Sequence, residues 1–280
     1  MLPGSAADVE IAVLQTAGST NDVAKKLAAG GAKNGALVVA DTQTEGRGRY
    51  ARAFYSPSGA GLYMSAVLRP GIGFREAPLV TIAAAVAVCR SVKKLTGFSP
   101  SIKWINDIFL NGKKVGGILT EAAAYPQSGP VSPDAAAYPH NGLASPDLAL
   151  NPQSGGVIAG MVAGIGINVS VRDEDFPEEL RRTAGSLYPD GNPKIAREAL
   201  AASIFAELLA LCEPRPLRER LFLDEYRSLS FVLGRHVCYT RGAESGAGLA
   251  AGIDGDGRLL VRSASGDIAA LDSGEVSITL

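Results

Sequence analysis

The residues best suited to chemistry in this 280-residue chain are cations grouped in a short glycine-rich segment. Within residues 46–52, three arginines alternate with glycines: Gly46, Arg47, Gly48, Arg49 and Arg52. Guanidinium groups stay charged and pair with carboxylate or phosphate oxygens, and glycine lets backbone N–H groups approach an anion. Two interpretations are open for this segment alone, an anion-binding loop or a solvated basic loop, because short Gly/Arg motifs recur by chance.

For several other reaction classes, the sequence lacks the residues or motifs that the chemistry requires. The chain has two histidines, His140 in a repeated insert and His236 at the start of a small β module, and neither is a good candidate for a Ser-His-Asp or Cys-His hydrolase. No HExxH or Walker A motif occurs, and Gly164-Ile165-Gly166 falls inside an expected strand, which disfavours a dinucleotide site. Cationic and amidic groups remain, and these suit chemistry in which fixed donors offset charge on phosphate.

The composition indicates an ordinary soluble globular protein, with 46% hydrophobic and 20% charged residues. A net charge of −1 gives no support for bulk nucleic-acid binding. The three cysteines form no CxxC pair, so neither a disulfide framework nor a zinc site is expected, and a cytoplasmic location fits best. We expect no signal peptide, and the longest apolar run, Leu79 to Cys89, is too short to span a bilayer.

Predicted strands and helices position the candidate residues. Strands are expected at 11–14, 36–43, 61–68, 102–104, 108–110, 115–121 and 157–169, and helices at 23–29, 77–95, 195–211 and 217–226. The strand at 36–43 leads into the Gly/Arg segment, and Asn111-Gly112 is a strong hairpin turn signal. Lys103 could be the exposed member of an alternating strand, and Trp104 and Ile105 have the composition of core residues. The hydroxyls of Ser19 and Thr20 could act as helix caps alone.

Two further segments differ in residue pattern from these strands and helices. Residues 122–156 contain Ala-Ala-Ala-Tyr-Pro repeated after 13 positions, which indicates a duplicated, extended hairpin tip without a catalytic role. Short β-like runs at 235–239, 248–253, 259–262 and 276–278 predict a small all-β module that leans on the main domain. We therefore expect a catalytic domain over 1–230 and a β module over 231–280.

Taken in order, the motifs resemble those of the biotin–protein ligases (biotin–[acetyl-CoA-carboxylase] ligases). The matching segments are Ser19-Thr20-Asn21, Thr42-Gln43 with Gly46 to Arg52, Lys103 to Asp107, Val115 to Glu121, Gly164 to Val169, and Leu233 to Ser277. Tyr50 and Ala51 replace a basic residue and a glycine usual in the family loop, and Ile105 replaces a proline. Since no helix-turn-helix segment precedes Val9, the resemblance is to the short class without a DNA-binding domain, and DNA binding is not carried over.

The resemblance implies an α+β fold in which helices pack on a mixed, mostly antiparallel sheet, the class II synthetase/biotin ligase-like catalytic domain, followed by a small SH3-like β-barrel. It also implies ATP-dependent ligation of biotin to a lysine of biotin carboxyl carrier protein through biotinyl-5′-adenylate, with Mg²⁺ accompanying ATP. Lipoate–protein ligase and a non-catalytic biotin-sensing protein remain alternatives. No DNA or membrane partner is expected, and homodimerisation stays open.

Residue roles follow from the same resemblance. Arg47 would lie near the biotin carboxylate, Arg49 near the adenylate phosphate, and Lys103 would bridge both groups as the third catalytic residue. Ser19, Thr20 and Gln43 would hydrogen-bond the ureido ring, and Asn168 would lie near the nucleotide. The other expected binding residues are Asn21, Gly46, Gly48, Arg52, Trp104, Asn106, Gly116, Gly117 and Gly166. The resemblance implies no particular set of metal ligands, and Asp107 is the candidate for one. The loop is expected to order over the adenylate.

Overall fold

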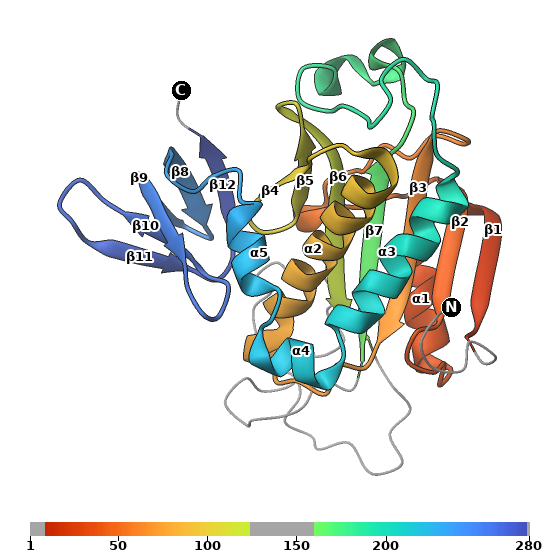
Figure 1. Cartoon of the computed structure of the whole chain (residues 1–280), viewed down its shortest axis with the longest axis horizontal. Coiled ribbons are helices and arrows are strands. Elements are labelled where there is room, and N and C mark those ends of the chain that lie inside the picture. The colour runs from red at the N-terminus through yellow and green to blue at the C-terminus, as the bar shows by residue number, and fades with distance from the viewer. Residues whose placement is uncertain (1–8, 124–159, 279–280) are drawn as a thin grey trace.

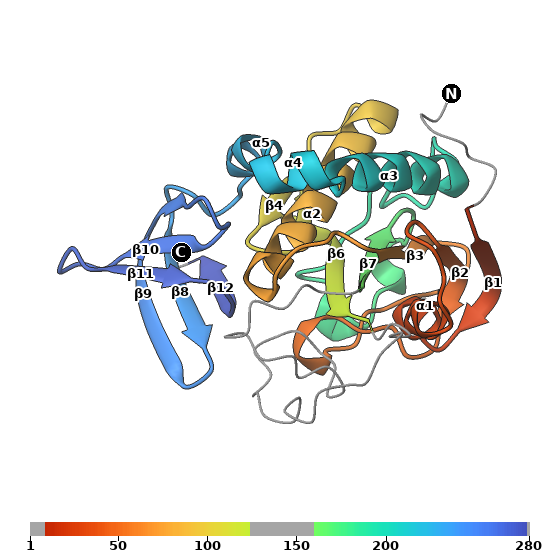
Figure 2. The same cartoon turned by 90° about the horizontal axis from the view of Figure 1, so that it is seen from below.

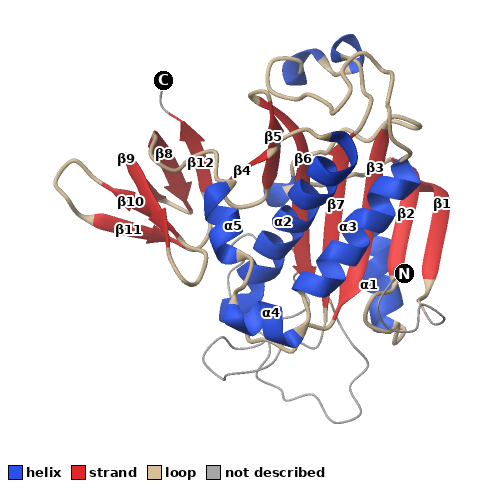
Figure 3. Cartoon of the chain, viewed as in Figure 1, coloured by secondary structure: helices blue, strands red, loops and turns tan. Residues whose placement is uncertain are grey.

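The structure, a computed structural model, describes residues 9–123 and 160–278. Its larger part is built on a seven-stranded sheet of β1 (Ile11–Ala17), β2 (Leu37–Gln43), β3 (Gly61–Leu68), β4 (Ser101–Lys103), β5 (Asp107–Leu110), β6 (Lys113–Ala122) and β7 (Met161–Asn168). The strand order is β1-β2-β3-β7-β6-β5-β4, and β1 and β2 are its parallel pair while the other neighbours run antiparallel. The predicted mixed, mostly antiparallel sheet is therefore confirmed (Figure 3).

Helices cover both faces of this sheet. The long α2 (Ala77–Thr96) and α3 (Arg197–Leu211) lie on one face, and α1 (Thr20–Ala29) lies on the other (Figures 1 and 2). Strand alternation sorts the side chains between them, since Ile165 and Ile167 of β7 join the large core under α2, whereas Val162 packs with α1. Positions 164, 166 and 168 of β7 therefore face the α1 side of the sheet.

A second, five-stranded antiparallel sheet forms the C-terminal module. Its strands are β8 (His236–Arg241), β9 (Glu244–Ile253), β10 (Leu259–Arg262), β11 (Ile268–Leu271) and β12 (Glu275–Ile278), in the order β11-β10-β9-β8-β12. Buried apolar residues of this module belong to the same core cluster as α2. The strand β11 was not predicted from the sequence.

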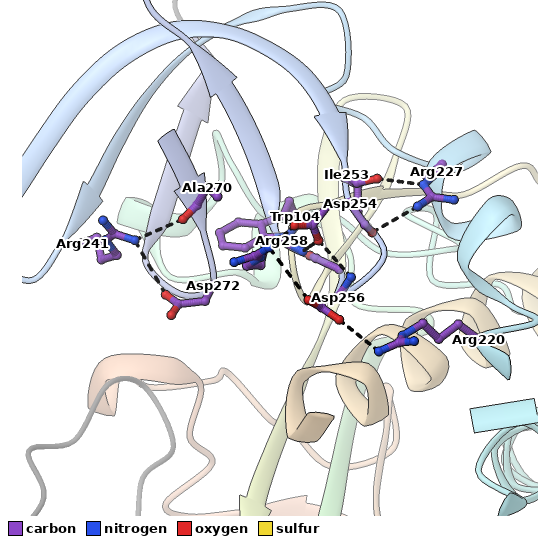
Figure 4. A network of polar contacts seen from close by, with 11 residues as sticks. Trp104, Arg220, Arg227, Arg241, Ile253, Asp254, Asp256, Arg258, Ala270 and Asp272 are labelled. Carbon is purple, nitrogen blue, oxygen red and sulfur yellow. Dashed lines mark hydrogen bonds and ion pairs between the residues drawn. The ribbon is translucent and has the colours of Figure 1, made fainter. Parts of the chain in front are cut away.

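The turn between β9 and β10 attaches the module to the larger part (Figure 4). Trp104 donates its indole N–H to the carbonyl oxygen of Gly257 at 3.0 Å. The guanidinium of Arg227 donates to the carbonyl of Ile253 at 2.8 Å, and Arg220 pairs with Asp256 at 2.9 Å. These contacts confirm that the module leans on the main domain, and they tie it to the segment that carries Lys103.

The predicted helix over 217–226 is wrong. The chain instead forms α4 (Pro214–Glu219) and α5 (Leu223–Ser228), because Arg220 adopts a left-handed conformation, with φ of 55°, that ends α4. Short 3₁₀ turns occur at Arg49–Ala51, Phe74–Glu76, Asp173–Asp175 and Glu178–Leu180. No helix within the described ranges is long and apolar enough to cross a membrane. Residues 124–156 of the repeated insert, with His140, lie outside the described residues.

Candidate functional site

A cavity of about 810 Å³ brings together the start of α1, the loop after β2, the β4–β5 turn and the last strand of the module. Most of the residues expected from the sequence line it, namely Ser19, Thr20, Asn21, Gln43, Arg47, Gly48, Arg49, Arg52, Lys103, Trp104, Asn106, Gly117 and Gly166. Gly46, Gly116 and Asn168 are not among its lining residues. The segments predicted to share one site therefore converge, although they are far apart in sequence.

Neutral hydrogen-bonding groups gather around Thr20 and Gln43. The Oε1 atom of Gln43 accepts from the Thr20 backbone N–H at 2.9 Å and lies 3.1 Å from its hydroxyl. The Nε2 atom of Gln43 donates to the Ser56 hydroxyl at 3.0 Å. Ser19 occupies the N-cap position, but its side chain makes no capping hydrogen bond, so capping alone does not explain the hydroxyl there. This part of the cavity suits an uncharged polar ligand group.

The three loop arginines all have partners in the structure. Arg47 pairs with Asp22 at 2.5 Å, and this hydrogen bond is the main reason that the pKa of Asp22 lies below its usual value. Arg49 donates to Asn106 Oδ1 at 3.1 Å and to the carbonyl of Gly274 at 2.7 Å. Arg52 pairs with Glu275 at 2.7 Å. The loop is thus held at one end by α1 and at the other by the C-terminal module.

Two non-glycine residues of this loop have positive φ angles. Tyr50 and Ala51 have φ of 56° and 55°, in the left-handed region that favours glycine. The Tyr50 hydroxyl accepts a hydrogen bond from Arg49 at 2.9 Å, and the Arg49 guanidinium lies 5.0 Å from the Tyr50 ring centroid. Tyr50 therefore contacts the Arg49 guanidinium while its own backbone adopts an unfavourable left-handed conformation.

Lys103 differs from the arginines because its ammonium makes no hydrogen bond or ion pair with any residue in the described parts of the chain. Its ammonium lies 6.0 Å from the centroid of the Phe109 ring. Burial lowers the pKa of Lys103, and the nearby carboxylate of Asp107 offsets this only in part. Asp107 itself pairs with Lys114 at 2.6 Å. Lys103 is therefore a partly desolvated cation that faces the cavity and is available to an anion.

The sequence did not reveal a buried polar network beneath the cavity. Glu121 of β6 is 1% exposed and pairs with Lys25 at 2.9 Å. The amide of Asn21 donates to Glu121 Oε2 at 2.6 Å, and its oxygen lies 2.6 Å from the hydroxyl of Ser65. Burial alone would lower the pKa of Lys25, but its contacts with Glu121 and Asp22 raise it. For Ser65 the available signal was a small polar residue within the largely apolar strand β3.

Close packing explains several glycines of the motifs. A Cβ on Gly164 would lie 2.0 Å from Asn21 Oδ1, and one on Gly166 would lie 2.6 Å from the Phe54 ring. A Cβ on Gly116 would lie 2.6 Å from the side chain of Ile167 and 2.7 Å from a backbone oxygen. The strand glycines therefore allow close packing of neighbouring side chains and backbone at the site.

The remaining two residues outside the lining have local contacts of their own. A Cβ on Gly46 would meet the Ser56 hydroxyl at 2.6 Å, so this glycine allows the loop to pack closely. Asn168 donates its amide to the carbonyl of Gly185 at 2.9 Å. Its buried Oδ1 atom has no hydrogen-bond partner among the described residues, which leaves one acceptor unused next to the site.

The described residues contain no group of three His, Cys, Asp or Glu side chains that could hold a metal ion. Asp107 and Glu275 are the carboxylates of the cavity lining, and Lys114 and Arg52 engage them. A Mg²⁺ ion bound through substrate phosphates and water needs only one or two carboxylates. The residues present therefore fit an ion that arrives with a nucleotide, and not a resident metal centre.

Comparisons with known proteins agree with this geometry. Residues 13–128 match the Biotin/lipoate A/B protein ligase family, and residues 232–278 match the Biotin protein ligase C terminal domain. The chain is 35% identical to the bifunctional ligase/repressor BirA of Bacillus spizizenii over 89% of this chain and 68% of that protein. It is 28% identical to the biotin–[acetyl-CoA-carboxylase] ligase of Mycobacterium tuberculosis, over 89% and 82% of the two chains. The structure is similar to the Aquifex aeolicus biotin protein ligase in complex with biotin and ATP, with a TM-score of 0.72, 26% identity and coverage of 96% and 98%.

Proposed function

This chain belongs to the biotin/lipoate A/B protein ligase family, and on that premise we propose how its residues carry out the ATP-dependent ligation of biotin to protein. The relatives named above are biotin ligases, so a lipoate–protein ligase is not favoured. The observation that carries the proposal is one cavity with neutral hydrogen-bonding groups around Thr20 and Gln43 and cations around Arg47 and Lys103. Biotin has the same polarity, with a ureido ring at one end and a carboxylate at the other.

In the first step a biotin carboxylate oxygen attacks the α-phosphorus of ATP, and pyrophosphate leaves. Two anions must approach one another, so nearby cations lower the barrier by offsetting their repulsion. Arg47 binds the carboxylate after leaving Asp22, and Arg49 binds the α-phosphate. Lys103 lies between these groups and stabilises the charge that develops on the phosphate oxygens. Support for this role comes from its burial and its lack of a partner within the described residues.

In the second step a lysine amine of the acceptor attacks the acyl carbon of biotinyl-5′-adenylate, and AMP leaves. The acceptor is biotin carboxyl carrier protein, a choice supported by the named activity of the Mycobacterium tuberculosis and Paracoccus denitrificans relatives. A Mg²⁺ ion bound with ATP would offset the charge of the phosphates, with Asp107 and Glu275 as the carboxylates of the cavity lining. The protein works in the cytoplasm. Its catalytic domain ends near residue 230, where the match to the C-terminal domain begins.

The deciding experiment is biotin-dependent exchange between ATP and labelled pyrophosphate. This assay reports the first step without an acceptor, and we expect exchange only when biotin is present. Calorimetry with biotin and with lipoate then tests the ligand, and only biotin should give a saturable signal. A non-catalytic biotin sensor would bind biotin without supporting exchange, and that result would overturn the proposed enzyme.

A further inference from the structure

The buried network beneath the cavity suggests a role for a residue that touches no ligand. We infer that Glu121 is a positioning residue that fixes the direction of a hydrogen-bond chain, so that Thr20 meets the ligand as an acceptor for a ring N–H group. The inference rests on the proposed function, because it names the ligand as the cyclic urea of biotin.

Glu121 fixes the orientation of the Asn21 amide. Both amide hydrogens of Asn21 have acceptors, since Nδ2 lies 2.6 Å from Glu121 Oε2 and 3.2 Å from the carbonyl of Leu119. If the amide were turned over, its oxygen would face a carboxylate and a carbonyl, and neither can donate a hydrogen bond. Lys25 donates to Glu121 Oε1 at 2.9 Å and holds this carboxylate in place. The Asn21 oxygen is therefore directed at Ser65.

Ser65 passes this direction on to Thr20. Its hydroxyl is fully buried and lies 2.6 Å from Asn21 Oδ1 and 2.7 Å from Thr20 Oγ1. A hydroxyl has a single hydrogen, and Asn21 Oδ1 can only accept, so the Ser65 hydrogen is committed to Asn21. The Thr20 hydrogen is then donated to Ser65, because the 2.7 Å contact between the two hydroxyls needs one hydrogen and Ser65 has none left for it. A lone pair of Thr20, which lines the cavity, is left to accept from the ligand.

This polarity selects for a ligand that carries an N–H group at the Thr20 position. Each ureido nitrogen of biotin offers one hydrogen, whereas the dithiolane ring of lipoate offers none. A site built to pair with a polar group discriminates strongly against an analogue that lacks it, because its own buried groups then stay unpaired. Glu121 would thus contribute to the selection of biotin over lipoate, although Asn21 and Ser65 separate it from Thr20.

Glu121→Gln should reverse the chain while leaving its shape intact. Lys25 requires the glutamine oxygen as its acceptor, so the glutamine NH₂ would face the NH₂ of Asn21. Asn21 can escape this contact only by turning its amide over. Ser65 would then donate to Thr20, which occupies one Thr20 lone pair and frees the Thr20 hydrogen from Ser65. We expect the dissociation constant for biotin to rise about tenfold, the scale of one misdirected hydrogen bond, with the affinity for ATP unchanged. Calorimetry on the full chain measures both.

Two double variants separate this role from general damage to the fold. In a Thr20→Val background, Glu121→Gln should have no further effect on biotin affinity, because the receiving hydroxyl is already gone. In a Lys25→Met background, the glutamine oxygen is free to face Asn21, so biotin affinity should return to within about threefold of the wild type. A purely structural role for Glu121 predicts additive losses in both backgrounds, and additivity would overturn the inference.

The control is Glu207→Gln, which removes one member of the Arg90–Glu207 ion pair between α2 and α3. It should leave biotin affinity unchanged. If Glu121→Gln does not fold, Ser65→Ala tests the next link and should weaken biotin binding by a similar factor. Wild-type protein that fails to bind biotin would refute the proposed function itself. If Glu121→Gln and Ser65→Ala both bind biotin as tightly as the wild type, only the role of Glu121 is refuted.

Discussion

Replacing Lys103 with methionine should abolish most adenylate formation without weakening the fold. Methionine keeps an unbranched apolar stem against Phe109 but removes the charge that faces the cavity. Loss of one fixed donor to a developing oxyanion costs about 3 kcal/mol, so we expect the rate of biotin-dependent pyrophosphate exchange to fall by about 10² to 10³. The dissociation constant for biotin should change by less than about threefold, because Thr20 and Gln43 remain.

The stability of this variant provides a second, independent readout. Burial lowers the pKa of Lys103, which means that the folded protein disfavours the charged form relative to water. Removing the charge should therefore leave the free energy of unfolding unchanged or raise it, as measured by urea unfolding at pH 7. A loss of both stability and activity would instead indicate structural damage.

Lys113→Met is the matched control for this experiment. Lys113 lies on the neighbouring hairpin and pairs with Asp173 at 2.8 Å on the surface, an interaction worth about 0–1 kcal/mol. Its exchange rate should stay within about twofold of the wild type. Near-normal exchange by Lys103→Met, or an equal loss in both variants, would refute the assignment of Lys103 to the chemical step.

Three further outcomes follow from the site. Arg47 holds the pKa of Asp22 below 3.8, so the stabilisation from this ion pair is complete above pH 3.8 and is lost as the pH falls through the lowered pKa. Arg47→Gln should therefore reduce the free energy of unfolding at pH 7. In urea titrations it should also make that free energy depend less on acid pH. Gly166→Ala should displace the Phe54 ring, which lies 2.6 Å from the added Cβ position, and raise KM for biotin in the exchange assay about tenfold or more. Biotin with ATP should protect residues 47–52 from trypsin, and equal cleavage with and without ligands would contradict a closing loop.

The sequence predicted the parts of the site that consist of local motifs. The Gly/Arg loop, Lys103 and the hairpin at Asn111-Gly112 all have chemistry or turn propensity that can be recognised within a few residues. The sheet and most helices follow from periodicity for the same reason. Cations, turns and amphipathic patterns are local signals, so no knowledge of the fold was needed to find them.

The contacts of those motifs could not be predicted in the same way. Arg49 meets the carbonyl of Gly274 and Arg52 meets Glu275, across more than 200 positions of the chain. Such pairings depend on how the C-terminal module packs, which the sequence pattern does not encode locally. The break at Arg220 was missed because an arginine gives no warning of a left-handed φ.

The contrast between the arginines and Lys103 suggests how the loop can be both anchored and mobile. The Arg52–Glu275 pair is exposed and screened by water, so breaking it costs little. In the proposed mechanism Arg47 exchanges Asp22 for the biotin carboxylate, which has the same charge, so an ion pair is conserved. Lys103 has no such partner within the described residues, so burying its charge lowers the free energy of unfolding. In the proposed mechanism the loop can therefore move with the ligand, while the β4–β5 turn holds the charge of Lys103 at the cavity.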